Sequence, residues 1–188
     1  MQLRGALLGI ALAACGGDDT QDGTLQDAPG ASEPALLVGI TAAHNQIRAN
    51  VATATPLPPL EWDPALAATA AAWVAMCRDQ DAPTGLIDHN AGRSMGAPYY
   101  VGENVFGAGG PPSPGVGEQA VTLWASEAKS YDYAANTCNG NCGHYTQIVW
   151  RATLKLGCAV GECPNLAYKT ALVCDYGPGG NVSNQRPY

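Results

Sequence analysis

Residues 143–150 read Gly-His-Tyr-Thr-Gln-Ile-Val-Trp and place one of the three histidines of the chain in a run of β-branched and aromatic residues. Such a composition favours a pleated, half-buried surface, and we predict a buried strand from His144 to Trp150. Alternate side chains of a strand share a face, which groups His144 with Thr146, Ile148 and Trp150. The histidine is then either a hydrogen-bonded core residue or part of a functional site, and this segment alone leaves both interpretations open.

The composition predicts one globular domain. A chain of 188 residues that is 46% hydrophobic and 13% charged is long enough for one core and short for two. The net charge of −7 is concentrated at the start, since five of the sixteen acidic residues lie in the first 34. The basic residues are scattered singly and the pI is about 4.7. This pattern excludes a nucleic-acid-binding protein.

The first residues indicate export. Residues 1–14 have a positive start, a short apolar run and a small-residue end, which is typical of a secretory signal peptide and too short for a permanent membrane span. The segment Leu12-Ala13-Ala14-Cys15 resembles the lipobox of bacterial lipoproteins, so we expect Cys15 to carry a lipid anchor to the membrane. An ordinary signal peptide is the alternative. A lipidated protein would be an outer-membrane lipoprotein or would lie at the cell surface.

The next stretch has the composition of a linker. Residues 16–34 are rich in Gly, Asp, Thr, Gln, Pro and Ala and have too little apolar surface to fold, so we predict a disordered tether. A single domain is expected from residue 35 to residue 188.

Six cysteines remain after Cys15, and an even number in an exported domain predicts three disulfides. A zinc site is the competing use of clustered cysteines, but no Cys-x-x-Cys pair occurs. Spacing alone does not select a connectivity. The six are Cys77, Cys138, Cys142, Cys158, Cys163 and Cys174.

The rest of the domain reads as helices followed by strands. Apolar residues recur at helical spacing from about 36 to 51, and a second helix is signalled by Asp63 as N-cap and Pro64 at the first helical position. A third helix is expected from about 116 to 131. The segment Arg78–Gly102 is expected to be a long polar loop, and a loop of this length inside a compact domain usually forms a functional surface. Besides residues 144–150, strands are expected at 156–160 and 170–176, paired antiparallel.

Two segments resemble the signatures of the CAP superfamily, which comprises cysteine-rich secretory, antigen 5 and pathogenesis-related proteins. Residues 143–153 match the first signature. Residues 172–181 match the second except at Asp175, where the family usually has a neutral polar residue or a base. The similarity covers residues 35–188 as an SCP-like domain, and is greatest to plant pathogenesis-related proteins of the first group. With these the chain shares His44-Asn45, Gly102-Glu103-Asn104, Leu123-Trp124-Ala125-Ser126-Glu127, Ser130-Tyr131-Asp132-Tyr133 and Gln185-Arg186-Pro187-Tyr188.

The resemblance implies an α+β fold, namely a three-layer α/β/α sandwich with a central antiparallel sheet stabilised by disulfides. Carried over by position, the disulfide pairs would be Cys77–Cys163, Cys138–Cys142 and Cys158–Cys174.

The resemblance also implies a cleft lined by two histidines and two glutamates: His89, Glu103, Glu127 and His144. His44 competes with His89 for its place, although it belongs to the first-helix motif. Two imidazoles and two carboxylates suit a divalent metal such as Zn²⁺. Without metal, the same groups would form a hydrogen-bonded network.

For function, the resemblance implies a monomeric binding or interaction module, with a sterol, another lipid or a protein as ligand. A metal-dependent or Glu/His-assisted hydrolase, with Glu103 or Glu127 as the catalytic group, is the alternative. Against it, the chain has no His-Glu-x-x-His, no Gly-x-Ser-x-Gly and no cysteine left over as a nucleophile. In a third interpretation the four cleft residues are structural, and the loops 78–102 and 106–115 bind a partner.

Overall fold

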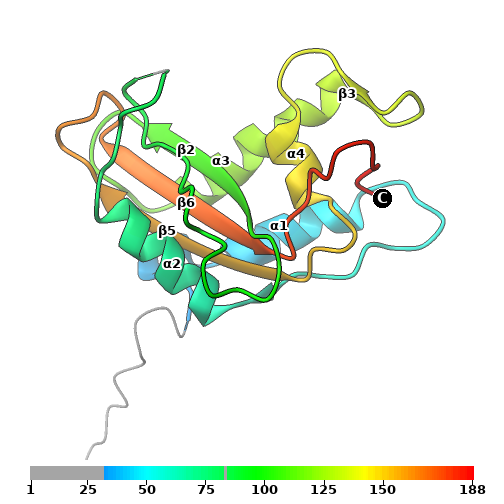
Figure 1. The fold of residues 1–188 in the computed structure, drawn as a ribbon, viewed down its shortest axis with the longest axis horizontal. Helices are drawn as coiled ribbons and strands as arrows, with labels where there is room; N and C mark the ends of the chain where they lie inside the picture. The colour runs from blue at the N-terminus through cyan, green and yellow to red at the C-terminus, as the bar shows by residue number, and fades with distance from the viewer. Residues whose placement is uncertain (1–31, 83) are drawn as a thin grey trace, which may run out of the picture.

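The computed structural model describes residues 32–82 and 84–188, so the predicted signal peptide, Cys15 and most of the predicted linker lie outside the described residues (Figure 1). Within the described part, no helix is long and apolar enough to cross a membrane. The elements are η1 (Ala35–Leu37), α1 (Ile40–Ala49), β1 (Glu61–Trp62), α2 (Pro64–Val74), β2 (Gly102–Ala108), α3 (Val116–Ala125), η2 (Ser126–Ser130), β3 (Tyr131–Asp132), β4 (Thr137–Cys138), α4 (Gly143–Ile148), β5 (Lys155–Glu162) and β6 (Thr170–Gly177), where η marks a 3-10 helix.

The main sheet has the strand order β1-β5-β6-β2, and the three long strands lie side by side in Figure 1. Strands β5 and β6 pair antiparallel, as predicted, and β2, which was not predicted as a strand, pairs antiparallel with β6. The short strand β1 pairs parallel with β5, which makes the sheet mixed rather than purely antiparallel. The expected α+β fold is therefore confirmed, with this one change in the sheet.

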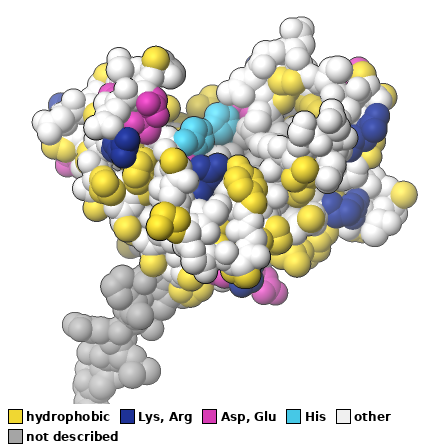
Figure 2. Space-filling model, viewed as in Figure 1, with side chains coloured by type: hydrophobic (Ala, Val, Ile, Leu, Met, Phe, Trp, Pro, Cys, Tyr) yellow, Lys and Arg dark blue, Asp and Glu magenta, His cyan; other side chains and the backbone are white. Residues whose placement is uncertain are grey.

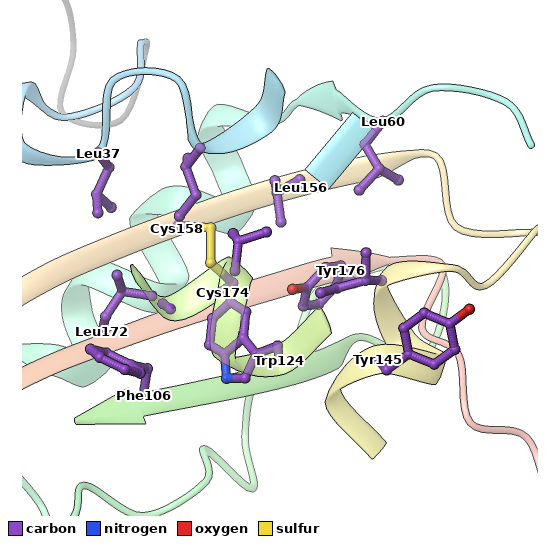
Figure 3. Packing of buried hydrophobic residues seen from close by; sticks show 14 of the residues in the cluster. Leu37, Leu60, Phe106, Trp124, Tyr145, Leu156, Cys158, Leu172, Cys174 and Tyr176 are labelled. Carbon is purple, nitrogen blue, oxygen red and sulfur yellow. A yellow bond between two sulfur atoms is a disulfide. The ribbon is translucent and has the colours of Figure 1, made fainter. Parts of the chain in front are cut away.

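The sheet separates two hydrophobic cores, and strand β6 contributes to both. Leu172, Cys174 and Tyr176 face the core under α1 and α3, part of which is shown in Figure 3. Ala171 and Val173 face the smaller core under α2. This alternation follows from the two-residue period of a strand that is covered on both faces. Helices on both faces of the sheet give the three layers.

The three disulfides implied by the resemblance are all present. Cys158 and Cys174 lie directly opposite each other on β5 and β6, with a Cα–Cα distance of 4.1 Å. The pair Cys77–Cys163 joins the chain after α2 to the chain after β5. The pair Cys138–Cys142 closes a small loop directly before α4.

The predicted strand from His144 to Trp150 is wrong, because Gly143–Ile148 forms the helix α4. Its β-branched residues favour a strand only weakly, and tertiary contacts override that preference. In a helix, residues three and four apart share a face, so His144 lies on the same face as Gln147 and Ile148 and no longer groups with Trp150. The other predicted helices and strands are found with shifted ends, and the helix expected from about 116 to 131 is divided into α3 and the 3-10 helix η2. The strands β1 to β4 were not predicted.

The carboxyl end of α4 is held by Arg48, a buried residue of α1. Its guanidinium donates hydrogen bonds to the carbonyl oxygens of Ile148 and Trp150, both at 2.8 Å. It also donates to the carbonyl oxygens of Pro58 and Thr153. Burial lowers the pKa of Arg48 to about 10, so the group still carries its charge at neutral pH. A cation at this end of a helix is favourable, since the last carbonyl groups have no partners inside the helix.

Candidate functional site

Two histidine–glutamate pairs form the core of the candidate site. The Nδ1 atom of His89 lies 2.7 Å from Oε1 of Glu103, and Nδ1 of His144 lies 2.6 Å from Oε1 of Glu127. Because a carboxylate only accepts hydrogen bonds, each Nδ1 carries the hydrogen and donates it. In a neutral ring, each Nε2 is then left as a free acceptor. The two pairs are alike in chemistry but are built on different supports.

The His144 pair is held by the amino end of α4. Helix α3 ends at Ala125, and the tighter turn η2 carries Glu127 up to the first residues of α4. Oε2 of Glu127 accepts hydrogen bonds from the backbone N–H groups of His144 (2.9 Å) and Tyr145 (3.2 Å). The imidazole of His144 also stacks on Trp124, with ring centroids 5.9 Å apart. Backbone, carboxylate and aromatic ring therefore all fix the orientation of His144.

The His89 pair joins the long loop to the sheet. Glu103 lies on β2 with its side chain fully buried, whereas the side chain of His89 is 59% exposed. Oε1 of Glu103 also accepts a hydrogen bond from the backbone N–H of Asn90 at 2.9 Å. The chain between α2 and β2 contains no helix or strand in its described residues, as predicted. Glu103 is the sheet residue that holds this loop segment beside the cleft.

His89, His144 and Glu127 line a cleft made of two adjoining cavities, whereas Glu103 is fully buried and lines neither cavity. A cavity of about 280 Å³ is lined by both His89 and His144. A cavity of about 590 Å³ is lined by His144, Glu127 and a largely apolar wall that includes Phe106. Figure 2 shows histidine side chains in a hollow between two raised parts of the surface. The cleft thus combines imidazole nitrogens with a space large enough for an organic group.

Comparison with known proteins places the chain in a family. The model of the cysteine-rich secretory protein family (CAP) matches residues 41–176. The chain belongs to this family. Pathogenesis-related protein 1 of Arabidopsis thaliana is 41% identical over 146 residues, which cover 78% of each protein. GLIPR1-like protein 1 of Bos taurus is 39% identical over 153 residues, and the match spans 77% of this chain but only 59% of that protein.

Solved structures agree with this assignment. Venom allergen-like protein 4 of Schistosoma mansoni has a TM-score of 0.64 at 26% identity and covers 82% of this chain and 94% of its own. A crystal structure of NaASP2 with Zn²⁺ has a TM-score of 0.61 at 26% identity and covers 81% and 84% of the two chains. The match to a secretory family also fits the predicted export of this CAP chain.

His44, the competing candidate, lies outside the cleft of this CAP domain. It is fully buried, its Nδ1 donates to the carbonyl oxygen of Ile40 at 2.8 Å, and its Nε2 accepts from the hydroxyl of Tyr176 at 2.8 Å. Burial lowers the pKa of His44 to about 4, so the ring is neutral and both of its nitrogens are occupied. The structure brings His89, and not His44, to the same cavity as His144.

One residue next to the site was not predicted to belong to it. Asp175 lies on β6 directly opposite Glu103 on β2 and is fully buried. Burial and the neighbouring charge of Glu103 raise the pKa of Asp175 to about 8. The signal in the sequence was the departure from the CAP signature at this position, but only the pairing of the strands shows which side chain it faces.

We expect Glu127→Ala to loosen the amino end of α4. The substitution leaves two backbone N–H groups and the Nδ1 of His144 without their acceptor, which should lower the free energy of unfolding by about 1–2 kcal/mol. Amide hydrogen exchange at His144 and Tyr145 should become faster. Glu118→Ala, an exposed glutamate of α3, serves as the control and should change stability by less than about 0.5 kcal/mol. Unchanged exchange at both amides in Glu127→Ala would contradict the assigned role.

Proposed function

We propose that this CAP protein is an exported binding module whose cleft takes a divalent cation such as Zn²⁺ between His89 and His144. One observation carries the proposal. Both Nδ1 atoms are engaged by glutamates, whereas neither Nε2 has a hydrogen-bond partner among the described residues, and both rings line the same cavity. Imidazole nitrogen is a preferred zinc ligand.

The donor set fits a metal held by two protein ligands. Histidine ligands of metals usually donate their second N–H to a carboxylate, and the two glutamates are placed to accept in this way. They would therefore support the ligands rather than bind the metal themselves. Within residues 32–82 and 84–188, no group of three or more His, Cys, Asp or Glu side chains is arranged around a common metal position. Water or a bound ligand would complete the coordination, and the presence of Zn²⁺ in the NaASP2 structure supports the choice of metal.

A binding role is better supported than catalysis. A bound metal would supply a Lewis acid, but a hydrolase also needs a group that is free to move a proton. Both oxygens of Glu127 accept hydrogen bonds, from the imidazole of His144 and from backbone N–H groups, so this carboxylate is not free to act as a base. Oε1 of Glu103 accepts from His89 and from the backbone N–H of Asn90, and the whole side chain is buried away from the cleft surface. Hydrolysis with either glutamate as the catalytic group remains the alternative.

Isothermal titration with Zn²⁺ tests the metal proposal. The wild-type protein should bind one ion, and His89→Ala and His144→Ala should each abolish the binding heat. Glu103→Gln and Glu127→Gln should weaken binding by about 10–100-fold, because they remove the support of a ligand. Glu118→Gln is the matched control and should bind as the wild type does. Equal heat from wild type and His144→Ala, or no heat from the wild type, would rule the site out.

A lipid ligand is the second candidate, and a groove between α1 and α3 favours it. The groove has a volume of about 380 Å³, and small side chains at Ala42, Ala43 and Gly117 leave room between the helices. Leu36, Val38, Ile47 and Val121 add apolar walls. A sterol ring system or an acyl chain would gain from burial of its apolar surface in this groove.

A sterol and fatty-acid pull-down with the Cys15→Ser chain tests this second candidate. Val38 is 75% exposed at the groove, and Val38→Asp should reduce capture at least about tenfold, since a charge in an apolar site is costly. Met95, which is 86% exposed and lies outside the groove, provides the matched control Met95→Asp. Equal capture by both variants would exclude the groove as the binding site.

We also propose that Cys15 anchors the protein to the membrane through a lipid, at the outer membrane or the cell surface. The support is the lipobox-like segment and the linker composition after it. Cells fed a labelled fatty acid should incorporate it into the wild-type protein and not into Cys15→Ser. Label retained by Cys15→Ser would refute the anchor.

A further inference from the structure

Two buried carboxyl groups face each other across the strands β2 and β6. Glu103 and Asp175 are register partners, and both side chains are fully removed from solvent. Three of their four oxygens, Oε2 of Glu103 and both oxygens of Asp175, have no hydrogen-bond donor among the described residues. Buried polar atoms are nearly always paired, so three unpaired oxygens in one place call for a physical explanation.

A shared proton explains them. Two ionised carboxylates only accept hydrogen bonds, and their charges repel each other in a buried setting. One proton between them removes the repulsion and supplies the missing donor. Glu103 already accepts two N–H donors at Oε1, from His89 and Asn90. Asp175 accepts none, so the proton resides on Asp175.

In the part of the chain that the structure describes, the groups around Asp175 offer no other donor. Arg93 is the nearby cation, but its hydrogen bonds go to the carbonyls of Asn90 and Val101 and to the hydroxyl of Tyr100. On β5 the register partner is Gly157, which has no side chain, and α2 packs so closely over it that a Cβ would lie 2.1 Å from the backbone nitrogen of Ala67.

The charged group of β5 nearest to this end of the sheet also has a partner other than Asp175. Lys155 of β5 pairs with Asp63, the N-cap of α2, at 2.9 Å. The next residue of β6, Tyr176, faces the opposite core, where its hydroxyl contacts His44 and Asn104. Of the charged groups on the elements packed against Asp175, only the Glu103 carboxylate remains as a hydrogen-bond partner.

We propose that Asp175, in its protonated form, is a positioning residue that donates a hydrogen bond to Oε2 of Glu103 and so extends the His89 pair into a relay of Asp175, Glu103 and His89. The relay belongs to the cleft described under the proposed function, but it forms in the metal-free protein. It also makes the two sides of the cleft different, because within residues 32–82 and 84–188 the oxygens of Glu127 accept from His144 and Tyr145 and have no carboxyl partner of this kind.

The relay predicts a change on the His89 side at alkaline pH. The folded protein holds the proton on Asp175 up to about pH 8, whereas the unfolded chain releases it near an ordinary aspartate pKa of about 3.9. The stability that this carboxyl contributes is therefore complete below the unfolded-state pKa of about 3.9, and it is lost as the pH rises to the folded-state pKa of about 8. Above about pH 8 both carboxyl groups are charged and repel each other. Glu103 then loses the hydrogen bond from Asp175, and the position of Glu103, which holds the ring of His89, is no longer fixed.

Infrared spectroscopy of the metal-free protein tests where the proton resides. At neutral pH the wild type should show the carbonyl stretch of a buried carboxylic acid, and the band should disappear above about pH 8 and in Asp175→Asn. Asp88→Asn is the matched control, since Asp88 is a buried aspartate whose oxygens accept backbone N–H groups of Gln80 and Asp81. That variant should keep the band. No band in the wild type, or a band that survives in Asp175→Asn, would overturn the proposal.

Imidazole NMR tests whether Asp175 acts on the cleft. As Asp175 loses its proton near pH 8, the NMR signals of the His89 ring should shift in a step that the signals of His144 do not show. Asp175→Asn keeps a neutral donor toward Glu103, so it should leave the His89 signals near their wild-type positions at neutral pH and abolish the step. A step that persists in Asp175→Asn, or that appears equally in both histidines, would refute the relay. No metal is added, so failure of zinc binding would leave this result unaffected.

Discussion

Helix α4 has only six residues and lies between two opposite charges, Glu127 at its amino end and Arg48 at its carboxyl end. So short a helix makes few hydrogen bonds of its own, and most of its backbone groups need partners from elsewhere. The carboxylate satisfies the first N–H groups and the guanidinium satisfies the last carbonyls, each with the sign that the helix dipole favours. His144 points into the cleft because the helix that carries it is held in this way.

The two sides of the cleft are supported by different means. His144 is fixed by a helix end, a carboxylate and the ring of Trp124, whereas His89 is an exposed loop residue held mainly by Glu103. A residue of the sheet, Glu103, therefore fixes the ring of His89 by a hydrogen bond, and a residue of the helical layer, Glu127, fixes the ring of His144 in the same way. This division explains why a buried group of the sheet, Asp175, affects only the His89 side.

Much of the fold was predictable from local patterns. The cap Asp63 followed by Pro64 gave the start of α2, and short segments joined by short connections gave the antiparallel strands β5 and β6. The resemblance to the CAP family gave the disulfide pairs and the four candidate site residues. The segment 143–150 was predicted wrongly, because β-branched residues carry only a weak preference that partners far away in the chain reversed. Nothing near Arg48 in the sequence shows the carbonyl groups that it binds a hundred residues later.

The amino-acid sequence by itself determined the CAP family and which imidazoles, carboxylates and cysteines are available, since these depend on residue types at given spacings. The pairing of the cysteines followed from the resemblance to the family and not from spacing. Only the tertiary structure decided that His89 and not His44 joins His144, that residues 143–148 are helical and that Asp175 faces Glu103. The physical reason is that burial and the pairing of distant strands determine which polar groups meet, and this depends on contacts between residues far apart in the chain.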